Sequence, residues 1–198
     1  MNEMVSAALG PWTNFYIIVG SAAAALTGLM FVVITLVVSS ERREAASIGT
    51  AAFSTPSVVS LVAALIVSAI SVIPWHSFVP FAVVVGAAGI GGVAYICRLI
   101  LMARRFEDYQ ADVEDWTWYW ILPIAAYGAM LVAAFFVGIA SYGALLAIAA
   151  AVLLHLLIGI HNAWDIVTYI TIERPEKEQY HPRSGTPSLP AEAEVKGP

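Results

Sequence analysis

Long apolar runs alternate with short polar stretches along most of this chain. A helix needs about 20 predominantly apolar residues to cross a bilayer, and five of the runs are about that long or longer. The pattern therefore predicts an all-α, polytopic membrane helix bundle with five transmembrane helices. We place these helices at residues 12–38, 55–73, 78–103, 118–140 and 144–172.

The apolar pattern stops after Glu173. Residues 173–198 are rich in proline and charged residues and have no apolar periodicity. Such a segment cannot bury enough apolar surface to offset the entropy lost on ordering. We expect a transmembrane domain at 1–172 and a disordered tail at 173–198.

The composition agrees with a membrane protein. Of the 198 residues, 60% are hydrophobic and 12% are charged, whereas soluble domains have about 45–50% apolar and about 25% charged residues. The one cysteine, Cys97, excludes an internal disulfide framework and a multi-cysteine metal site. The net charge of −5 and the scattered basic residues argue against nucleic acid as a partner.

The basic residues predict the orientation. They lie in the first connection, at the end of the third span and just after it, and in the tail: Arg42, Arg43, Arg98, Arg104, Arg105, Arg174, Lys177, Arg183 and Lys196. Cytoplasmic segments carry the excess of Lys and Arg in membrane proteins. We therefore expect the N-terminus outside and the C-terminus in the cytoplasm.

The fifth span carries a polar stripe. At about 100° per residue, six polar or ionisable residues fall within an arc of roughly 140°: His155, His161, Asn162, Asp165, Thr168 and Tyr169. A central Asp alone costs roughly 2.5–3.5 kcal/mol to insert, so the stripe should face the bundle interior or an oligomer interface. His161 and Asp165 are four residues apart and can touch.

Three readings of the stripe remain open: helix–helix contacts, a proton or ion path, and a metal or haem site. Interhelical polar contacts are common in membranes, with an average worth of about 0.6 kcal/mol. Arg98 lies at a depth similar to that of Asp165 and either pairs with it or extends to the inner headgroups.

The second span has a face of small residues that includes Ser57, Ser60, Ser68 and Ser71. Small residues at this spacing let two helix backbones approach closely. The same serines could instead line a narrow aqueous path, so the sequence leaves a packing seam and a pore lining as alternatives.

The sequence gives little support for a haem, catalytic or metal site. The histidines of the fifth span point about 120° apart, which disfavours a haem within one protomer. No Ser-His-Asp arrangement and no set of metal ligands can be built, so an enzyme is the least favoured class, and we predict no catalytic residue, metal or cofactor. The five carboxylates within 106–115 are more typical of a solvated acidic face than of a divalent cation site.

Three segments together resemble a group of small, uncharacterised bacterial integral-membrane proteins. They are Val19–Val32 (VGSAAAALTGLMFV), Ala52–Val59 (AFSTPSVV) and Gly159–Tyr169 (GIHNAWDIVTY). The resemblance covers the spans and omits the tail. It implies a multi-pass protein of the bacterial inner membrane and brings no activity, cofactor or catalytic residue with it.

The leading hypothesis is an oligomeric channel or proton/ion-conducting protein. His155 and Asn162 would be polar groups near the membrane midplane, and His161 and Asp165 would form a titratable gate near the cytoplasmic mouth, held by Arg98. The rival is a non-conducting accessory or regulatory subunit whose stripe docks another membrane protein. Either form would have the lipid bilayer and further copies of the chain as partners.

Overall fold

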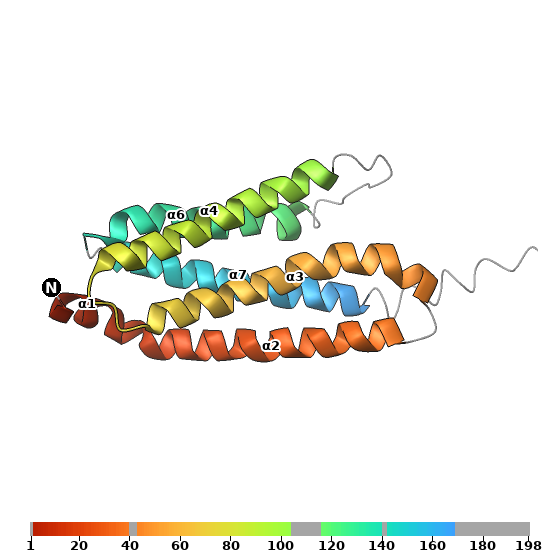
Figure 1. Cartoon of the computed structure of the whole chain (residues 1–198), viewed down its shortest axis with the longest axis horizontal. Helices are drawn as coiled ribbons and strands as arrows, with labels where there is room; N and C mark the ends of the chain where they lie inside the picture. The colour runs from red at the N-terminus through yellow and green to blue at the C-terminus, as the bar shows by residue number, and fades with distance from the viewer. Residues whose placement is uncertain (1, 40–42, 104–115, 140–141, 169–198) are drawn as a thin grey trace, which may run out of the picture. The chain divides into compact units, whose positions relative to one another are not determined.

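The computed structural model describes residues 2–39, 43–103, 116–139 and 142–168, and every element in these residues is helical (Figure 1). The elements are α1 (Asn2–Leu9), the 3₁₀ turn η1 (Gly10–Trp12), α2 (Thr13–Ser39), α3 (Arg43–Val72), α4 (Phe78–Ala103), the π-helix η2 (Thr117–Ile121), α6 (Leu122–Val137) and α7 (Tyr142–Thr168). The prediction of an all-α chain is confirmed for the described residues.

Four stretches of the described residues are long and apolar enough to cross a membrane: Glu3–Thr35, Phe78–Met102, Thr117–Val137 and Tyr142–Asp165. They indicate a multi-pass membrane protein. The second predicted span falls on α3, in which Pro56–Val72 is apolar but shorter than the other four stretches.

Helix boundaries agree best where the sequence has strong local signals. α4 covers 78–103 as predicted, and it follows Pro74 and Ser77, whose hydroxyl accepts a hydrogen bond from the Val79 amide at 3.3 Å. α2 lies within one residue of the first predicted span, but α1 and η1 precede it. The acidic stretch 106–115, Tyr169 and the tail lie outside the described residues.

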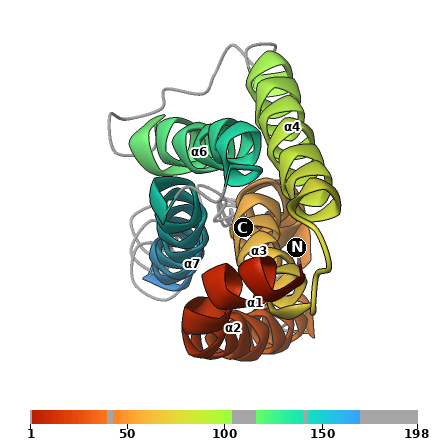
Figure 2. The ribbon, with the colours of Figure 1, turned by 90° about the vertical axis from the view of Figure 1, so that its left-hand side faces the viewer.

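The chain divides into a compact unit at Met1–Ile166 and a second unit at Val167–Pro198, of which the structure describes the last two residues of α7. In the first unit, successive long helices are antiparallel and form two close pairs, α2 with α3 and α4 with α6. α7 lies beside both pairs (Figure 2). It is the most buried of the four candidate spans, with 56% of its apolar window inside the bundle.

Glycines mark where the helices of each pair approach most closely. A Cβ on Gly89 of α4 would lie 3.0 Å from backbone atoms of Tyr127 and Leu131 on α6. A Cβ on Gly20 of α2 would lie 2.9 Å from the Cβ of Ser68 on α3. Both distances are shorter than ordinary contacts, so each pair depends on a position without a side chain.

The end of the bundle that holds the α3–α4 turn, here called the α1 end, is crossed by α1 (Figure 2). Val5 and Leu9 are buried there, while Met4 on the same helix is 59% exposed. The Trp75 indole N–H donates to the Ile70 carbonyl at 2.8 Å, which closes the C-terminal turn of α3 beneath it. The opposite end, which holds η2 and the last turns of α7, is called the η2 end.

Candidate functional site

Two polar side chains of α7 lie completely inside the bundle. His155 is 0% exposed and Asn162 is 1% exposed, and because they are seven residues apart they lie on the same face of the helix. Within the part of the chain that the structure describes, neither ring nitrogen of His155 and neither polar atom of the Asn162 amide has a hydrogen-bond partner. An unpaired buried donor or acceptor costs about 1–3 kcal/mol, so both residues lower the stability of the fold that encloses them.

The four predicted serines of α3 also face the interior; all are buried: Ser57, Ser60, Ser68 and Ser71. The Ser71 hydroxyl donates to the Val67 carbonyl of its own helix at 2.8 Å. A hydroxyl can form its hydrogen bond with a backbone carbonyl of its own helix in this way. An imidazole or an amide needs a partner on another helix. The Ser68 hydroxyl is itself unpaired among the described residues.

α3 touches α7 at Gly159 and α2 at Ser68, where a Cβ on Gly20 would lie 2.9 Å from the serine Cβ. A Cβ on Gly159 would overlap the side chain of Leu61, so α7 has no room for a side chain there. The helices are antiparallel (Figure 1), and each residue advances 1.5 Å. Counting from this contact places Asn162 at about the level of Ser57, and His155 about one turn from Ser68.

On its other side, the His155 ring contacts the ring of Tyr127 on α6. The ring centroids are 4.2 Å apart with an interplanar angle of 54°. Tyr127 in turn lies against Gly92 of α4, where an added Cβ would overlap three atoms of the tyrosine ring. Tyr127 is thus held between Gly92 and His155. Tyr95 lies near Tyr127, and its hydroxyl has no partner among the described residues.

At the η2 end, the π-helix presents two consecutive aromatic residues to α7. Trp118 stacks on His161, with ring centroids 3.8 Å apart and an interplanar angle of 18°. The Tyr119 hydroxyl donates to Asp165 Oδ2 at 3.3 Å. A π-helix has a wider turn than an α-helix and is frequent at functional sites, and here it lets neighbouring residues reach α7 one turn apart.

The remaining predicted residues of this end are less closely gathered. Asp165 is exposed and His161 is half-buried. Arg98 is exposed on α4, and the carboxylate of Asp165 accepts its hydrogen bond from the Tyr119 hydroxyl. Thr168 is the last residue of α7, and Tyr169 lies outside the described residues.

A cavity of about 330 Å³ opens at the α1 end. Its lining comes from α1, the start of α2 and the α3–α4 turn, and it includes Ser6, Thr13, Ser71 and His76. Ser71 is the outermost of the four buried serines, and the side chain of the buried Tyr16 is hydrogen-bonded to it.

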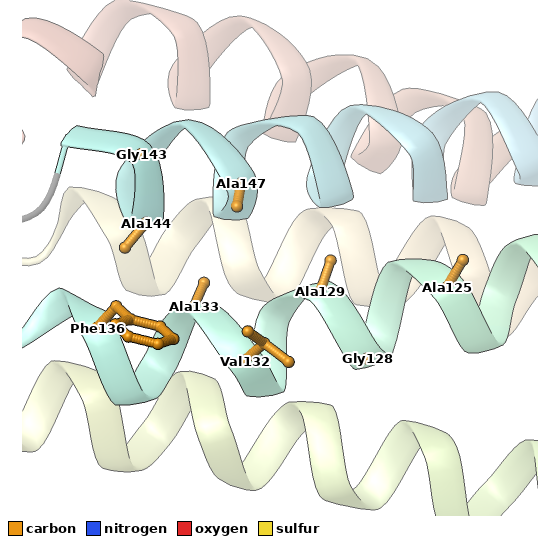
Figure 3. A pocket seen from close by; sticks show the side chains of 9 residues that line it. All are labelled: Ala125, Gly128, Ala129, Val132, Ala133, Phe136, Gly143, Ala144 and Ala147. Carbon is orange, nitrogen blue, oxygen red and sulfur yellow. The ribbon is translucent and has the colours of Figure 1, made fainter.

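A second hollow, of about 600 Å³, is an open groove between α6 and α7 (Figure 3). Small or apolar side chains line it: Ala125, Gly128, Ala129, Val132, Ala133, Phe136, Gly143, Ala144 and Ala147. Unlike the His155 region, this groove offers shape but no chemistry for a polar ligand.

The sequence did not single out Trp118, Tyr119 or Tyr127 as functional. The aromatic residues at 118–120 look like an ordinary interfacial belt, and the π-helix that turns two of them toward α7 has no signature in the residues. The described residues contain no group of three or more His, Cys, Asp or Glu residues that could hold a metal ion.

Comparison with known proteins adds no further identification. No protein-family model matches the chain, and neither the curated proteins nor the solved structures include one with significant similarity to it.

Proposed function

We propose that the chain is a five-span protein of the bacterial inner membrane, with its N-terminus outside and its C-terminus in the cytoplasm. α3 supports a count of five spans, because this helix runs for 30 residues and its stretch Pro56–Val72 is apolar. The distribution of Lys and Arg supports the orientation. In this orientation the α1 end is the outer end and the η2 end is the inner end.

Within this frame, we infer that the protein conducts protons along the contact between α3 and α7. The observation that carries the proposal is the burial of His155 and Asn162 with their polar atoms unpaired, in a bundle whose α3 also buries four serines. We call His155, Asn162 and these serines the polar row, and the Gly159–Leu61 contact supports it by bringing α7 against the helix that carries the serines.

The chemistry of the row favours protons over metal cations. A neutral imidazole and a hydroxyl each offer both a donor and an acceptor, so each can take up a proton on one side and release one on the other, and an amide can orient the neighbouring donor or acceptor. Hard cations need several oxygen ligands, usually including carboxylates. Among the described groups of the row no carboxylate occurs before Asp165 at the inner end.

The two ends of the row have features suited to entry and exit. The cavity at the α1 end reaches Ser71, the first serine of the row. At the other end, His161 and Asp165 are accessible and are oriented by Trp118 and Tyr119. We propose these two residues as the inner mouth.

The test is proton flux into liposomes that contain the purified protein and a trapped pH-sensitive dye, driven by a potassium diffusion potential. We expect flux above that of empty vesicles, and its loss in His155→Leu, which removes the buried imidazole at similar volume. The matched control is Leu157→Ala on the same helix, where the side chain is 48% exposed and should not matter. Absence of flux from the wild-type protein between pH 5 and 8 would refute the proposal.

The groove between α6 and α7 favours a second candidate, a non-conducting accessory subunit. Small residues on a helix surface allow another helix to pack closely, and Ala125, Ala129 and Ala133 repeat at four-residue intervals along one side of the groove (Figure 3). In that case Ala129→Leu would change the oligomeric state in detergent, and His155→Leu would have no effect on transport.

A further inference from the structure

The α1 end of the polar row is covered by a helix that contributes little to the rest of the bundle. α1 has eight residues, and η1 joins it to α2 through Gly10 and Pro11. Together with α2 it forms an apolar stretch of 33 residues, Glu3–Thr35. That is longer than the roughly 20 residues that a bilayer core accommodates, so α1 is in excess of what a span needs.

α1 is seated on the bundle end by two side chains. Val5 is 1% exposed and Leu9 is 8% exposed, and both line the cavity at this end. They are four residues apart, so they form one narrow apolar edge. The other face of α1 is open, with Glu3, Met4, Ser6 and Ala7 all exposed.

The residues beneath α1 belong to the polar row. The cavity that Val5 and Leu9 line has Ser71 among its walls, and Ser71 is 4% exposed. Tyr16, at the start of α2, is hydrogen-bonded to the same hydroxyl and is 2% exposed. The next serine inward, Ser68, is 1% exposed. Ser71 is therefore the group of the row that solvent in the cavity meets first.

We propose that α1 is a lid that pivots at Gly10–Pro11 and controls solvent access to Ser71 and the polar row below it. Its small seat is suited to this role, because two apolar side chains hold it in place while the long helices remain paired through α2–α3 and α4–α6 contacts. Gly10 has open space around its Cβ position, so the pivot is not obstructed by packing. The lid's effect on conduction rests on the proposed function, whereas its effect on access to Ser71 does not.

Access can be measured with a cysteine reporter. Cys97 is first replaced by Ala, and Ser71→Cys is then labelled in detergent micelles with a water-soluble maleimide, which reaches both ends of the bundle. Leu9→Asp puts a carboxylate on the seated edge and should displace α1, raising the labelling rate about tenfold or more. Met4→Asp makes the same chemical change on the exposed face of α1 and should leave the rate within about twofold.

A second reporter separates lid opening from unfolding. Val85→Cys lies on α4, is 0% exposed, and should stay unlabelled in the Leu9→Asp protein. Labelling of both reporters would show that α1 is part of the core, and equal rates for Leu9→Asp and Met4→Asp would show that α1 does not cover Ser71. Either result overturns the lid.

Flux from proteins that keep Ser71, with and without Leu9→Asp, distinguishes the lid from the proton path. If Leu9→Asp raises both labelling and flux, the lid and the conduction proposal both stand. If labelling rises selectively at Ser71→Cys while no variant conducts protons, the lid stands and the proposed function fails. If the wild-type protein conducts and labelling does not respond to Leu9→Asp, the lid fails alone.

Discussion

Replacing Gly92 by alanine is the sharpest single test of how the bundle holds His155. Gly92 of α4 faces the Tyr127 ring, and an added Cβ would overlap three of its atoms. The ring cannot simply move away, because the His155 ring lies on its other side with centroids 4.2 Å apart. The new methyl group must therefore displace α4 from α6 or press Tyr127 into His155.

The expected change in the free energy of unfolding is the difference between two opposing contributions. Alanine is better than glycine inside a helix by roughly 0.5–1 kcal/mol. Overpacking a close-packed core by a methyl group costs typically 1–3 kcal/mol, and the rigid ring and the neighbouring backbone contact at Gly89 favour the upper part of this range. We expect Gly92→Ala to lower the free energy of unfolding by about 1–2 kcal/mol, as the difference of these terms.

Gly91 provides a matched control one residue away. It is exposed, and a Cβ there would have no atom within 4 Å. Gly91→Ala should leave stability unchanged or raise it by up to about 1 kcal/mol. Reversible unfolding in mixed detergent–SDS micelles, followed by tryptophan fluorescence, measures both variants under identical conditions.

Tyr127→Ala completes the cycle. It creates a cavity and should cost about 3–5 kcal/mol by itself, but in its background Gly92→Ala has nothing to collide with. The two changes should then couple by 1 kcal/mol or more, as contacting residues do. Equal effects of Gly92→Ala and Gly91→Ala, or additivity with Tyr127→Ala, would refute the placement of Tyr127 between α4 and α7.

Two more substitutions test the contacts of α7 in the same unfolding assay. Gly159→Ala should destabilise the protein by about 1–2 kcal/mol, because the new methyl group collides with the buried Leu61. The effect should vanish in a Leu61→Ala background. An effect that persists there would contradict the α3–α7 register. Tyr119→Phe removes the donor to Asp165 and should cost less than about 1 kcal/mol, because the bond is long and partly exposed; it should have no effect in Asp165→Ala protein if the bond forms as described.

The helices could be predicted largely from the sequence, and the reason is local. An apolar run followed by a helix-breaking residue such as Pro74 contains its own boundary signals, and α4 begins and ends where the pattern predicts. α1 was not predicted because its apolar edge has two residues, Val5 and Leu9. The seat that buries them comes from the α3–α4 turn, more than 60 residues later in the chain.

The partners of the candidate site could not be predicted, since they depend on register between helices distant in sequence. The cost of polar groups in hydrocarbon was enough to select His155 and Asn162. It does not indicate that Tyr127 meets His155, because that contact follows from where glycines let the backbones approach. Likewise, Tyr119 reaches Asp165 through a π-helix, and its five residues do not indicate a π-helix rather than an α-helix.

The distinction between a structural stripe and a conducting one depends on whether its polar groups are satisfied. Side chains that serve as interhelical contacts stabilise a bundle by pairing with one another, as Tyr119 and Asp165 do at the η2 end. His155 and Asn162 are buried more deeply, yet their polar atoms are unpaired within the described chain. A leucine at position 155 would fill similar volume without the penalty of about 1–3 kcal/mol for an unpaired group. His155→Leu should therefore make the protein more stable while abolishing flux; a structural imidazole would show the opposite, a loss of stability with transport unchanged.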